Sequence, residues 1–112
     1  MGDRANVVVK CGEEKVCLYT HWSGTDLPTV LQGALAFAKE EGRLDDFSYL
    51  NRIIFERMID GSISKSRGFG ISVEPPDGHD RILTVNLDKG TVGNGTDSVL
   101  IGAYIYQPLE WE

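Results

Sequence analysis

The chain has 112 residues, of which 41% are hydrophobic and 25% charged, and it carries a net charge of −6 at pH 7. A length near the commonest domain size predicts one domain over residues 1–112, because such a chain buries about two-thirds of its unfolded surface in one core. The negative charge repels a phosphate backbone and argues against nucleic acid as a partner. No apolar run reaches the length of about 18 residues that a membrane span needs.

The first ten residues lack the long apolar stretch of a secretion signal. We therefore expect the protein to stay in the cytoplasm of the cell that makes it, with Cys11 and Cys17 as free thiols. A zinc site would have to combine these cysteines with His21 and His79, but their spacing does not match the close pairs of structural zinc sites. We predict neither a metal site nor another cofactor.

Two runs of β-branched and aromatic residues open the chain. Residues 5–11 and 16–20 are separated by residues 12–15, which predicts an antiparallel hairpin with a four-residue loop. The next segment, HWSGTDLP, breaks the strand pattern and places Thr25 or Asp26 where the cap of a helix belongs.

Two amphipathic helices are predicted next. Apolar residues at spacings of three and four predict a helix over residues 27–41 that ends at Gly42. The second helix begins after Asp45 or Asp46 and continues to Gly61, with an apolar stripe broad enough to contact both a sheet and the first helix.

The remaining residues predict strands joined by glycine-rich turns. A loop over residues 61–70 leads into a strand at 69–73, and residues 81–87 alternate cleanly. After a turn at 88–97, residues 98–106 predict a long last strand. The order ββααβββ predicts an α+β fold, an antiparallel sheet of about five strands with two helices packed on one face.

Two short segments carry residue types that suit a ligand. In HWSG, Trp22 can stack on a base or ribose and His21 can donate to an oxygen; the alternative is a core wedge and a turn histidine bonded to a backbone carbonyl. In RGFG, Arg67 offers a forked donor for phosphate and Phe69 a flat face; the alternative is a solvated arginine and a core strand.

A third candidate is Arg57, which lies next to the apolar stripe of the second helix and can reach a cleft; the alternative is an ion pair with Glu56 or Asp60. Phosphate-loop motifs are absent, and the cysteines and histidines form no recognisable nucleophile motif. These observations favour ligand binding over catalysis.

The runs LYTHWSGTDLPTVLQGAL (18–35), DDFSYLNRIIFERMI (45–59) and FGIS (69–72) carry a family resemblance. Over roughly residues 16–88, the chain resembles small phage-encoded proteins that share the motif Y-[ST]-H-W-x-G before a helix. Its size and ββαα order are similar to those of the anti-Thoeris sponge family, phage proteins that sequester nucleotide-derived immune signals without cleaving them.

This resemblance implies a homo-oligomer in the infected bacterial cell, with pockets at subunit edges that enclose a cyclic ADP-ribose isomer or a cyclic oligonucleotide. In such a site, Trp22 and Phe69 would provide the aromatic face, and Arg57 and Arg67 the forked donors. His21 and Asn86 would make secondary polar contacts.

Other readings of the chain stay open. A protein-binding inhibitor of a host defence enzyme requires acidic residues clustered on one face, and a small nucleotide hydrolase requires His21 or His79 beside a carboxylate. Tyr104 and Tyr106 on the predicted last strand are expected to be exposed, either at a subunit contact or over the open face of the sheet.

Overall fold

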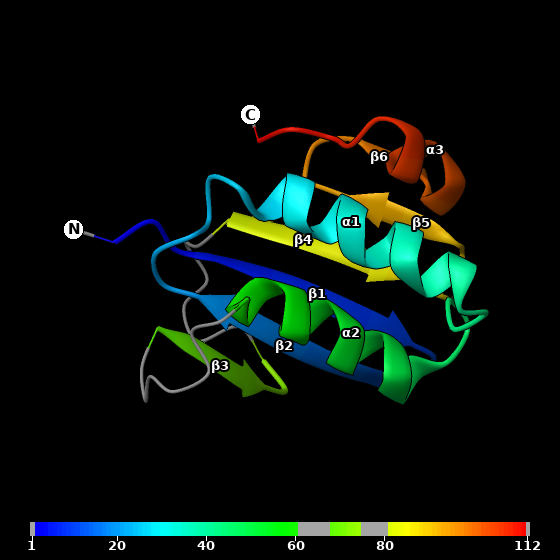
Figure 1. Cartoon of the computed structure of the whole chain (residues 1–112), viewed down its shortest axis with the longest axis horizontal. Coiled ribbons are helices and arrows are strands. Elements are labelled where there is room, and N and C mark those ends of the chain that lie inside the picture. The colour runs from blue at the N-terminus through cyan, green and yellow to red at the C-terminus, as the bar shows by residue number, and fades with distance from the viewer. Residues whose placement is uncertain (1, 61–67, 75–80, 112) are drawn as a thin grey trace.

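The computed structural model describes residues 2–60, 68–74 and 81–111, so the predicted candidates Arg67 and His79 lie outside the described residues. The predicted α+β class is confirmed (Figure 1). The elements are β1 (Ala5–Cys11), β2 (Glu14–Thr20), α1 (Leu27–Glu40), α2 (Phe47–Ile59), β3 (Phe69–Ser72), β4 (Arg81–Asn86), β5 (Thr91–Gly93), β6 (Ser98–Leu100) and α3 (Ile101–Tyr106).

The sheet has six strands in the order β3-β2-β1-β4-β5-β6. The central pair, β1 and β4, runs parallel, and all other neighbours are antiparallel. The sequence prediction of about five antiparallel strands thus missed β5, which lies inside the expected turn at 88–97, and the parallel pair. The periodicity of apolar residues shows which face of a strand is buried, but not which strand lies beside it or in which direction that strand runs. The parallel pairing of β1 with β4 therefore could not be predicted from it.

The hairpin of β1 and β2 has a two-residue turn at 12–13, shorter than predicted. Its register places Cys11 opposite Glu14 and Cys17 opposite Val8. Because side chains alternate between faces along a strand, the two thiols point to opposite faces of the sheet. A disulfide between them would require the backbone to move.

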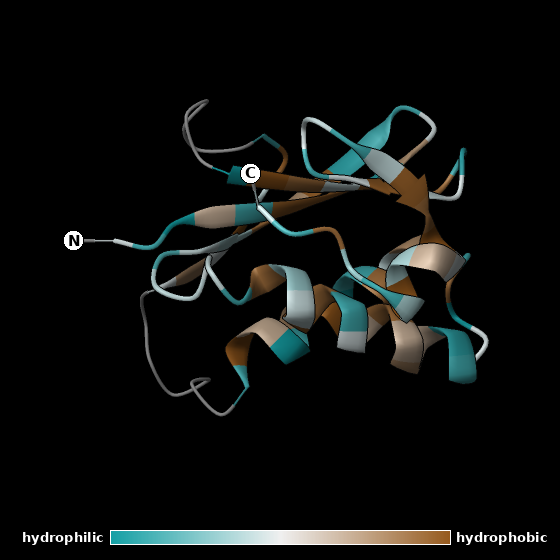
Figure 2. Ribbon diagram, turned by 90° about the horizontal axis from the view of Figure 1, so that it is seen from above, coloured by the Kyte–Doolittle hydropathy of each residue, from teal (hydrophilic) through white to brown (hydrophobic). Residues whose placement is uncertain are grey.

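All three helices lie on one face of the sheet (Figure 2). The predicted spans of α1 and α2 agree with the structure to within two residues at each end. Asp46 caps α2, since its side chain accepts the N–H of Tyr49 at 3.2 Å. Asp26 occupies the N-cap position of α1 but makes no side-chain cap. The core between sheet and helices is formed by apolar residues that include Val7, Val9, Leu18, Leu31, Leu35, Leu50, Ile54, Leu83, Val85 and Val92.

The predicted long last strand is wrong beyond residue 100. Residues 98–100 form β6, and the chain then turns into α3. Ile101 and Tyr104 are buried and lie one helical turn apart. This helical spacing cannot be recognised in the sequence, because the residues around them are also apolar and suit a buried strand equally well. Tyr104, expected to be exposed, is fully buried, and its hydroxyl donates to the carbonyl of Pro28 at 2.8 Å. Tyr106 is exposed as predicted.

None of the described helices has the length and apolar character needed to cross a membrane.

Candidate functional site

The structure places the candidate residues in separate regions. His21, Trp22 and Phe69 lie at the end of the sheet where β1 begins, because Ala5 pairs with Thr20 and Thr20 with Phe69. Asn86 pairs with Lys10 near the end of β1, at the opposite end of the sheet. Arg57 lies on α2. Within one chain, Asn86 therefore lies away from the other candidates, and its Oδ1 accepts the N–H of Lys89 in the turn after β4.

The segment around His21 and Trp22 is fixed by main-chain hydrogen bonds. The N–H of His21 donates to the carbonyl of Gly68 at 2.9 Å, and its carbonyl accepts the N–H of Asp3 at 2.7 Å. The indole N–H of Trp111 donates to the carbonyl of Gly24 at 2.7 Å, so the C-terminal segment packs on this loop. These hydrogen bonds anchor the loop to the chain around Asp3, Gly68 and Trp111.

The aromatic side chains of this corner contact one another. The Tyr19 hydroxyl lies 2.8 Å from Nδ1 of His21, and the His21 ring meets the Trp22 ring edge-on at 5.0 Å. Trp22 is 51% exposed and lies over Gly68, where a side chain would collide with the indole. Trp22 is thus not the buried core wedge of the alternative interpretation, and its exposed surface is available for stacking.

Phe69 fits its structural alternative. It is partly buried against the core and meets Phe55 of α2 edge-on, with ring centroids 6.5 Å apart. Phe69 and Ile71 lie two residues apart on β3 and pair with Thr20 and Leu18, so Phe69 points to the same face of the sheet as Leu18. Leu18 belongs to the core beneath the helices, and the ring of Phe69 is therefore on the helix-covered face. Phe69 therefore joins α2 to the edge of the sheet.

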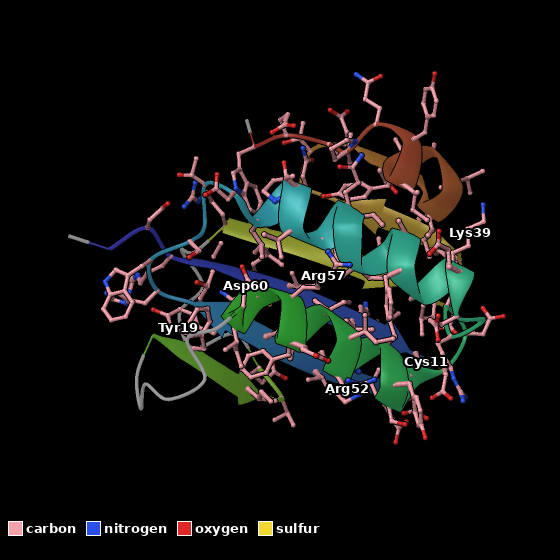
Figure 3. All side chains as sticks on the ribbon, viewed as in Figure 1. Cys11, Tyr19, Lys39, Arg52, Arg57 and Asp60 are labelled. Atoms are coloured by element: carbon pink, nitrogen blue, oxygen red, sulfur yellow. The ribbon has the colours of Figure 1, made fainter. Side chains whose placement is uncertain are left out.

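The most complete binding geometry lies between the two long helices. A groove of about 400 Å³, called here the arginine groove, is lined by Phe37, Arg52, Ile53, Glu56, Arg57 and Asp60. Figure 3 shows Arg57 in the space between α2 and α1, with Asp60 at the C-terminal end of α2. The groove combines an aromatic ring, cationic groups and carboxylates, the polar and apolar mixture that orients small ligands.

Arg57 does not make the ion pair that its neighbours suggested. Glu56 pairs instead with Arg52, one turn away on α2, at 2.5 Å. Within the described residues no ion pair is found for Arg57, and its guanidinium lies over the ring of Phe37, 5.7 Å from the centroid. A guanidinium held against a ring keeps its N–H edge free for a forked bond to an anion.

Gly33 on α1 gives Arg57 its place. A Cβ at position 33 would lie 3.2 Å from Nη1 of Arg57, closer than such atoms normally approach. A glycine inside a helix costs about 1 kcal/mol relative to alanine, so its presence in α1 has a structural consequence. Gly33 and Phe37, one turn apart, form the wall on which the guanidinium rests.

The sequence prediction missed Gly33 and Phe37. Both residues carried a signal, because a glycine interrupts an otherwise strong helical pattern and Phe37 falls outside the apolar stripe of α1. Phe37 is 40% exposed, an unusual position for a large aromatic ring on a helix surface.

The described residues offer little for nucleophilic catalysis. Cys17 is fully buried, and burial raises the pKa of its thiol, which keeps it protonated. The partner of the His21 ring is the hydroxyl of Tyr19 and not a carboxylate. In the described part of the chain, no three His, Cys, Asp or Glu side chains gather closely enough to hold a metal ion.

Comparison with known proteins gives no further guide to this site. No family model matches the chain, and no curated protein or solved structure is significantly similar to it.

Proposed function

We propose that this protein binds a small nucleotide-derived signal and sequesters it without cleaving it, the function implied by the resemblance to the anti-Thoeris sponges. The observation that carries the proposal is the position of the Arg57 guanidinium in a groove of about 400 Å³. The guanidinium contacts the aromatic ring of Phe37 instead of a carboxylate. A cation held in this way has its hydrogen-bonding capacity available for a phosphate.

The other groups of the arginine groove suit the remaining parts of a nucleotide. The exposed part of the Phe37 ring can stack on a base, and the carboxylates of Glu56 and Asp60 can accept hydrogen bonds from ribose hydroxyls or a base amino group. The groove thus combines the guanidinium of Arg57, the ion pair of Arg52 with Glu56 and the carboxylate of Asp60, a mixed set that favours a ligand with both phosphate and hydroxyl groups over a plain polyanion.

Sequestration without cleavage is supported by rigidity. Gly33 and Phe37 fix the guanidinium before binding, which lowers the entropic cost of association. A sponge needs affinity and no turnover, whereas a hydrolase needs a base or nucleophile at the scissile bond. The hydrolase alternative requires His21 or His79 beside a carboxylate. His79 lies outside the described residues, and the ring of His21 has the hydroxyl of Tyr19 as its hydrogen-bond partner.

The test is a thermal-shift screen with cyclic ADP-ribose isomers and cyclic di- and trinucleotides, followed by chromatography of the ligand released on heating. A ligand present at a hundredfold its dissociation constant stabilises the folded state by about 2.7 kcal/mol. Intact ligand in the released fraction supports sequestration. An altered ligand would make the protein an enzyme, and no shift with any nucleotide would refute the proposal.

Variants locate the site. Arg57→Ala removes the cation and should abolish the shift, and Arg57→Lys should weaken it because an ammonium lacks the fork. Arg43→Ala is the matched control, since Arg43 also stacks on an aromatic ring, that of Tyr49 at 4.3 Å, but lies outside the groove. Loss of binding in Trp22→Ala with Arg57→Ala unaffected would move the site to the aromatic corner and contradict the role of the groove.

A further inference from the structure

The ion pair of Arg52 with Glu56 lies on the wall of the arginine groove. The two residues are four positions apart on α2, and Nη1 of Arg52 lies 2.5 Å from Oε1 of Glu56. Both side chains line the groove together with Arg57, and they are 63% and 70% exposed. An exposed ion pair at this spacing shifts an equilibrium by only about twofold. A ligand can therefore separate the two partners at a small loss of affinity.

The contact with Glu56 keeps Arg52 apart from Arg57. In Figure 3, Arg57 lies between α2 and α1, and Arg52 lies on the opposite side of α2. Two guanidinium groups repel each other, and an anion between them removes this repulsion. Arg52 will therefore leave Glu56 for a ligand that brings negative charge to both arginines.

Two adjacent phosphates supply the charge that this exchange needs. Hydrogen bonds between a guanidinium and a phosphate contribute roughly tenfold or more to an equilibrium, which exceeds the contribution of about twofold from the exposed ion pair. A lone phosphate is already bound by Arg57, so it attracts Arg52 less strongly than two phosphates do. The second phosphate thus decides whether Arg52 takes part in binding.

The exchange also releases the carboxylate of Glu56. A carboxylate next to phosphates is repelled by them unless it accepts a hydrogen bond from the ligand. Ribose hydroxyls are suitable donors, and they belong to the sugar that carries the phosphates of a nucleotide. A ligand with both a second phosphate and a ribose hydroxyl therefore satisfies both partners of the broken pair.

From these contacts we infer that Arg52 is a second phosphate-binding residue, which passes from Glu56 to the ligand on binding, and that the arginine groove selects ribonucleotides with two adjacent phosphates. Arg57 binds one phosphate, Arg52 binds the next, and the released Glu56 accepts a ribose hydroxyl. The inference rests on the proposed function, because it requires a nucleotide in this groove. A nucleotide with one phosphate leaves Arg52 on Glu56.

Three adenine nucleotides test this selection by isothermal titration calorimetry on the full chain. ADP and AMP share the base and the ribose, so their affinities compare two phosphates with one. ADP should bind about tenfold more tightly than AMP, because it alone recruits Arg52. The dideoxy form of ADP, which lacks the ribose hydroxyls, should bind less tightly than ADP, because the released Glu56 then finds no donor.

Variants assign these preferences to the two residues. Arg52→Gln should remove most of the preference for ADP over AMP, and Arg52→Lys should leave an intermediate preference because an ammonium lacks the fork. Glu56→Gln should narrow the difference between ADP and its dideoxy form, since a neutral amide repels phosphate less. The matched control is Arg43→Gln, because Arg43 also pairs with a carboxylate, that of Asp46 at 3.1 Å, but lies outside the groove. Its preference for ADP should equal that of the wild type.

The outcomes separate this inference from the proposed function. Equal affinities of the wild type for ADP and AMP, or a wild-type preference for ADP in Arg52→Gln, would overturn the role of Arg52. The proposed function would still stand in that case if nucleotide binding were lost in Arg57→Ala. If no nucleotide bound to the wild type in either assay, the proposed function and the inference would both fail. Circular dichroism of each variant checks that the exposed substitutions leave the fold intact.

Discussion

The guanidinium of Arg57 rests on the backbone of Gly33, so close that a Cβ at position 33 would lie 3.2 Å from its Nη1. This contact joins α1 to α2 one helical turn before Phe37, which lines the arginine groove. A glycine that weakens its own helix while seating a cation is typical of sites where stability is given up for function.

Replacing Gly33 separates the two effects. Gly33→Ala should raise the intrinsic stability of α1 by up to about 1 kcal/mol. Because the new methyl group pushes the flexible end of Arg57 out of its position by a few tenths of an ångström, the same variant should weaken nucleotide binding. Urea unfolding and the thermal-shift assay measure these two quantities in the same preparation.

A serine at position 33 provides the control, since its Cβ causes the same crowding without the full gain in helix propensity. If Gly33→Ala kept wild-type binding, the contact between Gly33 and Arg57 would have no part in ligand recognition.

The long elements could be predicted from the sequence because their signals are local. The apolar spacing of α1 and α2, the cap at Asp46 and the alternation of β4 all act within a few residues. The helix α3 was missed because Ile101, Tyr104 and Ile105 lie in an apolar run that continues from β6 and suits either structure. The parallel pairing of β1 with β4 depends on contacts between residues far apart in the chain, which local patterns do not contain.

The site could be predicted only in part. Arg57 and Trp22 were selected by residue type, and the structure gives both an accessible surface suited to a ligand. Whether they belong to one site depends on which end and face of the fold each reaches, and that is decided by the tertiary arrangement. Phe69 has the residue type expected at a ligand site but belongs to the packing between β3 and α2.

Tyr104 anchors α3 to the start of α1 through its bond to the carbonyl of Pro28. Tyr104→Phe should lower the free energy of unfolding by about 1 kcal/mol, because the buried carbonyl loses its donor. Tyr106→Phe, at an exposed position, should have no such effect. Equal stabilities of the two variants in urea unfolding would contradict a structural role for the Tyr104 hydroxyl.

Alkaline titration offers a separate check on Tyr104. Burial raises the pKa of its phenol far above the ordinary value. The folded state then binds a proton that the unfolded state releases above about pH 10, so stability should fall as the pH rises through that value. Phenolate absorbance should show that one of the four tyrosines ionises only as the protein unfolds, and that Tyr104→Phe removes this late step.

Asp3 should contribute to stability against acid. The N–H of Thr25 donates to its carboxylate at 2.9 Å, and Arg81 pairs with it; the hydrogen bonds from Thr25, followed by Arg81, lower the pKa of Asp3. A folded-state pKa below the unfolded one gives stability that is present above about pH 4 and is lost as the pH falls through the folded value. Asp3→Asn should flatten the decline of the urea midpoint in that window, and an unchanged slope in this variant would contradict the role of Asp3.

The two cysteines should differ in reactivity, since Cys17 is fully buried and Cys11 is partly exposed. Burial raises the pKa of Cys17 and outweighs the charge of Lys15, which lowers it, so the reactive thiolate is scarce as well as inaccessible. A thiol-disulfide reagent should therefore modify one thiol per chain in the native protein and two in denaturant. Cys11→Ser should remove the fast phase and Cys17→Ser should keep it. Two fast thiols in the native protein would mean that the face of the sheet carrying Cys17 opens readily, and none would mean that Cys11 is covered in solution.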